Sequence, residues 1–303
     1  MTDKKRKWLI ILFVLIPGAL ILSVAVPLIF QTLQPLPPVP PLPNPNGYDD
    51  LVKAGEMILS DFDKDDYRQF SAEKLKALMI KNAGAFEIAR MGLQQKSRVP
   101  LDYSATSPVH LEKLSAIKQL AVAFAAEGKL AETENRPNDA VKSYLDMVQL
   151  ANQSVYGGTL IDEMVGRVTE AIGTENLKRL TGELDAKSCR ETAAALETLD
   201  SQRQTWNEVM QQEAAWSRRT YPGLRDRFQA MMMANSLKKV FEKAGEKFAA
   251  QQLKTRQLIV QLAAHGYELD KGRPPANAAD LVPDYLKAIP QDPLTGTNVV
   301  YAP

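Results

Sequence analysis

The chain of 303 residues has few of the side chains that most often build reactive centres. Its single cysteine, Cys189, can form no intramolecular disulfide, so stability must come from packing. We expect this residue to be buried on a helix rather than to act as a reactive thiol. The two histidines, His110 and His265, stand far apart, and neither has the spacing of a zinc-ligand motif. We therefore predict no metal site.

Motifs for nucleotide binding and for acid–base catalysis are also missing. No glycine-rich loop is followed by Lys-Ser or Lys-Thr, so nucleotide binding has no support. Among the many carboxylates, Asp162 and Glu163 form the pair with most interest, because they lie near several glycines. Adjacent residues on a helix point about 100° apart, so we do not expect this pair to act on one bond. We predict no catalytic residues, no cofactor and no enzymatic activity.

The chain has no large excess of charge of either sign. The first seven residues hold four of the 37 Lys and Arg and one of the 36 Asp and Glu, which leaves 33 basic and 35 acidic residues in the remainder. A nucleic-acid-binding domain usually carries a basic surplus. We therefore expect no nucleic-acid partner.

One long apolar run, residues 8–30, indicates where the chain resides. It has no charged residue, and at about 1.5 Å per residue its 23 residues would span a bilayer core of roughly 30 Å. The basic tail, residues 1–7, precedes it. This order predicts a single-pass transmembrane helix in contact with the lipid bilayer of the cell inner membrane, a cytoplasmic N-terminus and an extracytoplasmic remainder. The alternative is a signal peptide cleaved after Ala25, but the apolar run continues past that site.

Residues 31–47 follow as a proline-rich linker. Seven of the eleven residues 35–45 are proline, which favours an extended polyproline II conformation. We expect a semi-rigid stalk between the membrane and the folded domain. A ligand for an SH3-like domain is the alternative.

Residues 48–264 are expected to form a helical domain. A first short helix is predicted to end at the acidic segment 61–66, whose Asp61, Asp63 and Asp65 have the spacing of a calcium loop but lack its Gly and Glu. Ser71 is expected to cap a helix that reaches residue 95, residues 98–108 form a connector, and a long helix then runs to residue 130.

Residues 124–150 carry the best local signal in this domain. Gly128, Ala131, Ala140 and Tyr144 resemble the pattern of a tetratricopeptide repeat, in which small residues let two antiparallel helices approach and an aromatic ring fills the gap. Pro137 is expected to stop the first helix. No second copy occurs 34 residues away, so we predict one helical hairpin, TPR-like in its contacts, rather than a peptide-binding array.

Further helices are predicted over residues 159–180, 188–199 and 202–221, with a last long helix from Met231. Gly158, Gly166 and Gly173 are expected to share one face that packs closely on another helix. Methionines 231–233 are interpreted as core residues. The arginines 218, 219, 225 and 227 are interpreted as a solvated face, although they could also meet lipid headgroups or an acidic partner.

Residues 265–303 change character, with frequent prolines and a short strand predicted at 298–301. The motifs Gly272-Arg273-Pro274-Pro275 and Asp292-Pro293, followed by Gly296 and Tyr301, resemble the C-terminal region of type II secretion major pseudopilins. That resemblance implies a small sheet after a long helix, hence a small α+β cap. The pseudopilin N-terminus is absent, because no prepilin cleavage site precedes the apolar run and no Glu lies in its first turn.

Taken in order, these features resemble a set of uncharacterised single-pass bacterial membrane proteins. The predicted fold is mainly α. The predicted role is that of a non-enzymatic interaction or scaffold protein of the cell envelope, with a protein partner. Two alternatives remain, namely a component of a secretion or pilus-like apparatus, and a hydrolase with an unrecognised site.

Overall fold

The computed structural model describes residues 35–59, 66–104 and 109–300. Over these ranges the protein is mainly α, with nine α-helices and no β-strand, which confirms the predicted class. No helix within them is both long and apolar enough to cross a membrane. The predicted transmembrane segment, residues 8–30, and the acidic residues 61–65 lie outside the described ranges.

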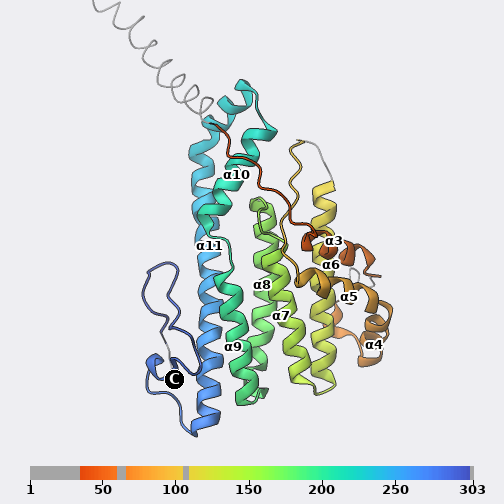
Figure 1. Cartoon of the computed structure of the whole chain (residues 1–303), viewed down its shortest axis with the longest axis vertical. Helices are drawn as coiled ribbons and strands as arrows, with labels where there is room; N and C mark the ends of the chain where they lie inside the picture. The colour runs from red at the N-terminus through yellow and green to blue at the C-terminus, as the bar shows by residue number, and fades with distance from the viewer. Residues whose placement is uncertain (1–34, 60–65, 105–108, 301–303) are drawn as a thin grey trace, which may run out of the picture.

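The helices follow one another along the chain, with the longest connections after α3 and after α5 (Figure 1). They are α3 (Gly47–Met57), α4 (Ala72–Lys81), α5 (Ala83–Leu93), α6 (Val109–Thr133), α7 (Pro137–Gln153), α8 (Leu160–Leu180), α9 (Ala186–Ser201), α10 (Trp206–Thr220) and α11 (Leu224–Lys271), with short 3-10 turns η2 (Tyr67–Gln69), η3 (Thr181–Glu183) and η4 (Ala278–Leu281).

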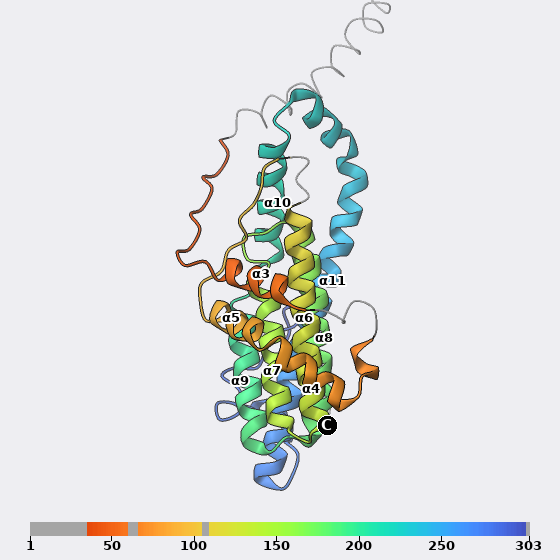
Figure 2. The same cartoon turned by 90° about the vertical axis from the view of Figure 1, so that its right-hand side faces the viewer.

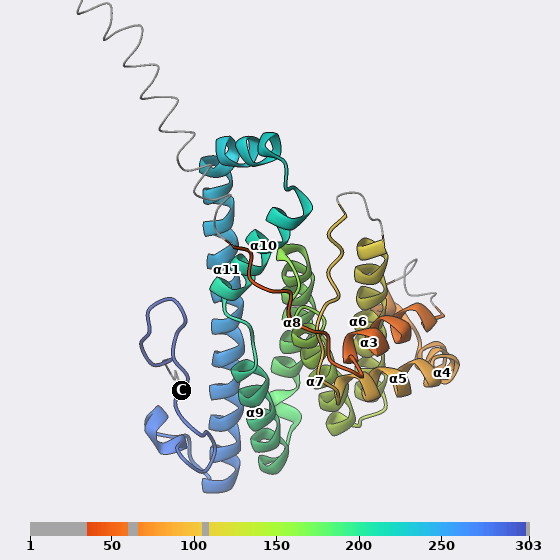
Figure 3. The same ribbon diagram turned by 45° about the horizontal axis from the view of Figure 1, so that its top comes forward.

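Helix α7 lies at the centre of the bundle, packed along both α6 and α8. Helix α9 packs mainly on α11, and α8 also contacts α6 and α11. Helices α3 and α4 lie against α6 on one flank, and α5 packs on α3 and α7 beside them (Figure 2). Helix α10 and the first part of α11 extend beyond the other helices at one end (Figure 3). Helix α8 therefore contacts α6 and α11 in addition to α7.

Helices α4 and α5 replace the single helix that was expected after Ser71. The cap itself is confirmed, because the Ser71 side chain accepts a hydrogen bond from the Lys74 backbone N–H at 3.3 Å. The helix breaks at Asn82, whose buried amide accepts from the Leu59 N–H at 2.8 Å and donates to the Leu78 carbonyl at 2.9 Å. An asparagine that bonds to a distant backbone group in this way competes with the regular helix.

The hairpin of α6 and α7 is confirmed. A methyl group added at Gly128 would lie 2.4 Å from the Tyr144 ring, so glycine is required for this approach. Ala131 and Ala140 are buried at the same interface. Pro137 has a different role from the expected one, since α6 already ends at Thr133 and Pro137 begins α7. A proline is favoured at that position because the first helical N–H needs no partner within the helix.

The glycine face of α8 is confirmed at two of its three positions. Added methyl groups at Gly166 and Gly173 would lie 2.4 Å from Val155 and 3.0 Å from Val148. Val148 lies on α7 and Val155 just after its end, so both glycines let α8 pack closely on this part of the protein. Gly158 precedes the helix and contacts the side chain of Asp162 instead.

The last helix is longer than expected at both ends. It begins at Leu224 rather than Met231 and continues past His265 to Lys271, where Gly272 ends it with a φ of +68°. The helix continues because its apolar contacts do. Gly266 packs on Cys189, and Tyr267 is buried. The interpretation of the methionines as core is wrong for Met232, which is 65% exposed.

The predicted α+β cap is wrong over the described residues. Up to residue 300 the C-terminal segment contains η4 and one isolated antiparallel bridge between Gln291 and Asn298, but no strand. Leu281, Tyr285 and Leu286 pack into the core formed by α7, α8, α9 and α11. Burial of these side chains against helices, rather than pairing of backbones, holds the segment in place.

The end of the proline-rich linker is fixed to the folded domain. Residues 35–46 form no helix and are mostly exposed. Asn46 closes the segment, because its amide donates to the Arg98 carbonyl at 3.0 Å and accepts from the Arg98 N–H at 2.9 Å. Arg219 on α10 also donates to the Pro37 carbonyl.

Candidate binding groove

Helix α8 presents three different faces, and one of them is open. One face carries the glycines that pack on α7, and a second carries buried charges. The third face carries Ile161, Met164 and Val168, whose residues are 44%, 60% and 62% exposed. A row of large apolar side chains with this exposure is unusual on a protein surface that binds no partner. We call the depression along this face the α8 groove.

A buried ion network fixes the position of α8. Glu170 is fully buried, and it accepts hydrogen bonds from Arg203 Nη1 at 2.7 Å and from the Thr255 hydroxyl at 2.7 Å. Arg167 pairs with Glu170 and also with Glu163, 2.6 Å away. A buried charge is tolerated only when such partners compensate for the lost water. The network therefore joins α8 to α11 and to the turn before α10.

Asp162 and Glu163 diverge, as their adjacency predicted. Asp162 is fully buried, and its carboxylate accepts from the Thr159 N–H and hydroxyl at 2.7 and 2.8 Å, which caps α8. The other oxygen of Asp162 lies 3.0 Å from His110 Nε2. Glu163 points instead to Arg167. The two carboxylates do not face a common space.

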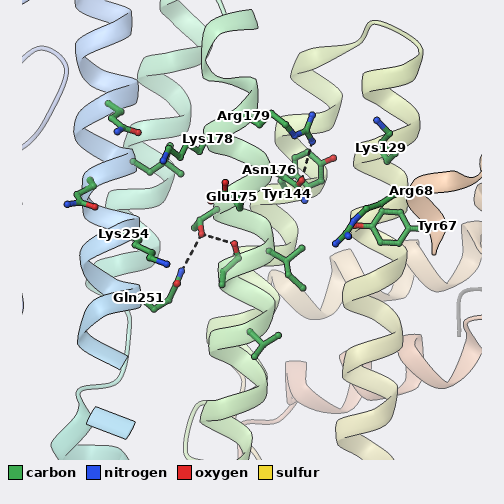
Figure 4. Close-up of a pocket in the computed structure, with 17 residues that line it drawn as sticks. Tyr67, Arg68, Lys129, Tyr144, Glu175, Asn176, Lys178, Arg179, Gln251 and Lys254 are labelled. Atoms are coloured by element: carbon green, nitrogen blue, oxygen red, sulfur yellow. Dashed lines mark hydrogen bonds between the residues drawn. The ribbon is translucent and has the colours of Figure 1, made fainter. Parts of the chain in front are cut away.

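A cleft of about 980 Å³ lies at the C-terminal end of the groove, between η2 and α6 on one side and α11 on the other (Figure 4). Its lining is rich in positive charge. We call it the cationic cleft, and its cations are Arg68, Lys129, Lys178, Arg179 and Lys254. Glu175 is the one carboxylate in its described lining, and amides of Asn176, Gln251, Gln257 and Gln261 supply further polar groups.

Part of this charge is engaged within the cleft. Arg179 donates to both oxygens of Glu132, at 2.9 and 2.6 Å, and the Tyr144 hydroxyl donates to the same carboxylate at 2.6 Å. Burial opposes ionisation of Glu132, but these donors outweigh it and hold the pKa of its carboxyl below the usual range. Lys129 lies 3.5 Å from the same carboxylate, and Arg68 lies 3.9 Å from Asp66. Lys178 and Lys254 line the cleft without an ion pair to another described residue. The cleft thus has a positive surplus available to a ligand.

An apolar trough of about 530 Å³ continues from the cationic cleft toward the N-terminal end of α8. The two hollows share Tyr67, Arg68, Val168 and Ile172. Beyond them, Ile161 and Met164 are common to the trough and to a third hollow of about 460 Å³ beside His110 and Trp216. The α8 groove is therefore continuous along the helix, apolar in its middle and cationic at one end.

The other side chains considered from the sequence do not extend this groove. Cys189 is fully buried, as expected, and burial raises the pKa of its thiol to about 11. Arg219 is held by Pro37 and lies over the Tyr103 ring. Over the ranges that the structure covers, no group of three or more His, Cys, Asp or Glu could hold a metal ion.

Sequence reasoning did not find the groove, although a signal was present. Positions 161, 164, 168 and 172 are apolar at helical spacing, in addition to the glycine face that was recognised. The glycine face packs on α7, so the apolar stripe needs a second neighbouring helix to cover it. Comparison with protein-family models, curated proteins and solved structures gives no match to this chain.

Proposed function

We propose that this protein is a non-enzymatic interaction protein of the cell envelope, which binds an anionic segment of a protein partner in the α8 groove. Residues 8–30 would anchor it in the inner membrane and leave the helical domain outside the cytoplasm, as the sequence predicts. The observation that carries the proposal is the cationic cleft. Its Arg179 and Lys129 are held by Glu132 and its Arg68 by Asp66, whereas Lys178 and Lys254 form no ion pair among the described residues.

The chemistry of the cleft favours anion binding over catalysis. Ammonium and guanidinium groups attract carboxylates, and amides can donate to them. Lys178, Lys254 and Gln257 reach the cleft from two different helices, so an anionic ligand would bridge α8 and α11. Residues 8–303 as a whole are close to neutral, so the local positive surplus is a feature of the cleft rather than of the whole surface.

Photo-cross-linking in intact cells of the native host tests the proposal. A photoreactive side chain replaces Gln257 inside the cleft, and the captured protein and its cross-linked peptide are identified. We expect an acidic peptide of one specific partner, and we expect the double variant Lys178→Glu/Lys254→Glu to lose the capture. The matched control, Lys239→Glu/Lys243→Glu, makes the same charge change at exposed positions of α11 outside the cleft.

Two results would contradict the proposal. One is capture that persists unchanged in the Lys178→Glu/Lys254→Glu variant. The other is an equal loss in the control pair, which would show that total charge matters and the cleft does not.

A further inference from the structure

The α8 groove has a second property that limits what can occupy it. The exposed residues Ile161, Met164 and Val168 and the half-buried Ile172 are separated by three, four and four positions, so they form one apolar stripe along the helix. An anionic ligand held only by the cationic cleft would leave this stripe in water. The stripe therefore indicates that the ligand has an apolar part that continues from its anionic part.

We infer that the occupant is an amphipathic α-helix of a partner protein, with its apolar stripe in the trough and its carboxylates at the cationic cleft. This inference rests on the proposed function. It specifies the shape and polarity of the partner segment that the groove binds.

The groove favours a helix over an extended peptide. Strand addition at the open edge of a β-sheet is one common mode of binding an extended peptide, and the described residues include no β-strand. The walls and floor are helices, and the wall from α6 contributes the small side chains of Ala121 and Ala125. Small residues allow a neighbouring helix to approach within the usual 8–10 Å. Since α8 has 21 residues, the groove suits a helix of about 20 residues, roughly 30 Å long.

The direction of the charge gradient is set by the lining. Lys129, Lys178 and Lys254 lie at the C-terminal end of α8. At the other end the hollow is lined by apolar and aromatic groups such as Leu111 and Trp216, and the Glu213 carboxylate accepts a hydrogen bond from the Leu160 N–H at 2.8 Å. Lys118 is a further cation in the lining of the trough, but most of the positive charge lies at the C-terminal end of α8. Carboxylates of the ligand are therefore favoured toward that end.

A binding measurement with designed peptides tests the inference on the full chain in nanodiscs of neutral lipid. The first fluorescent peptide has 20 residues, leucines on one helical stripe and glutamates in its last two turns. The second has the same composition in scrambled order. The third keeps the glutamates but replaces the leucines with serine. Fluorescence anisotropy gives the three dissociation constants.

We expect the first peptide to bind at least about tenfold more tightly than the other two, because it alone can bury the stripe. Val168→Glu in the trough is expected to weaken its binding about tenfold or more. Ile80→Glu is the matched control, because Ile80 is 71% exposed on α4, outside the groove. It is expected to change binding less than about twofold. Equal binding of the scrambled peptide, or equal effects of the two substitutions, would overturn the inference.

The outcomes also separate the inference from the proposed function. If the serine peptide binds as tightly as the first and Lys178→Glu/Lys254→Glu abolishes both, the anion site stands and the helical occupant is excluded. If that double variant leaves binding of the first peptide unchanged, the anion site itself is excluded. Binding of phosphatidylglycerol vesicles that is lost in Val168→Glu would place lipid in the trough and overturn the inference. Absence of binding by all three peptides would overturn the inference, and the proposed function would then depend on the result of the cross-linking at Gln257.

Discussion

Thr255 on α11 donates its hydroxyl proton to Glu170 on α8 across 2.7 Å, at a point where neither residue is exposed to solvent. The same carboxylate accepts from Arg203, so three segments far apart in the sequence meet at one side chain. The α8 groove is open on the face of α8 away from these groups. Its shape therefore depends on a network that takes no part in lining the trough.

Removal of the Glu170 charge should destabilise the protein strongly. Glu170→Gln removes the carboxylate that Arg203 and Arg167 share and leaves them only Asp200 and Glu163 respectively. Breaking a buried ion network in this way costs up to about 3–5 kcal/mol. Thr255→Val removes only one neutral donor and should cost about 1–2 kcal/mol. Urea denaturation followed by circular dichroism measures both. Equal effects of the two substitutions would show that the charge of Glu170 is not what holds the helices together.

Substitution of Gly128 tests the α6–α7 contact. Gly128→Ala places a methyl group 2.4 Å from the Tyr144 ring, and the required displacement should cost about 1–3 kcal/mol. Gly84→Ala is the control, because its nearest neighbour would be the end of the Met57 side chain at 3.9 Å. At that helical position alanine should be neutral or should stabilise by up to about 1 kcal/mol. Thermal unfolding of the two variants decides, and a neutral Gly128→Ala would refute the close approach.

The ion pair of His110 and Asp162 should make stability depend on pH. The nearby Asp162 carboxylate raises the pKa of His110 above its ordinary value, against burial and the charge of Lys113, while Asp102 adds to the increase. A raised pKa means that protonated His110 stabilises the fold. The contribution is complete below the unfolded pKa of about 6.5 and is lost as pH rises through the folded pKa.

His110→Gln should therefore lower the free energy of unfolding more at pH 5.5 than at pH 8.5. Urea titrations of the wild type and the variant at both pH values measure the difference. A larger loss at the higher pH would be inconsistent with the pair, and so would a loss that does not vary with pH.

The Cys189 thiol should react slowly in the folded protein. It is fully buried, and burial raises its pKa to about 11, so little reactive thiolate forms near pH 8. Alkylation by iodoacetamide at pH 8 should proceed at least about tenfold faster in 6 M guanidinium than in buffer. Mass spectrometry over time gives both rates. Comparable rates would mean that α9 opens readily from α11.

Short-range features of this protein were accessible from the pattern of residues alone. The Ser71 cap and the α6–α7 hairpin depend on contacts within 16 positions of the chain, and the residue types there leave few alternatives. The main-α class followed from the same periodicity. The break at Asn82 was missed because it requires the backbone of Leu59, which is 23 positions away.

The tertiary structure alone decided the groove and the ends of the fold. Glu170 meets Arg203 and Thr255 over 33 and 85 positions, and no local pattern reports such a pairing. The stripe of Ile161, Met164 and Val168 has the spacing of a core face, and only the positions of α6 and α11 leave it open. The segment after α11 was expected to form a small sheet, but packing of Leu281 and Tyr285 on helices leaves it without a strand through residue 300. Local periodicity determines which residues can form a face, whereas the neighbouring helices determine which face remains exposed.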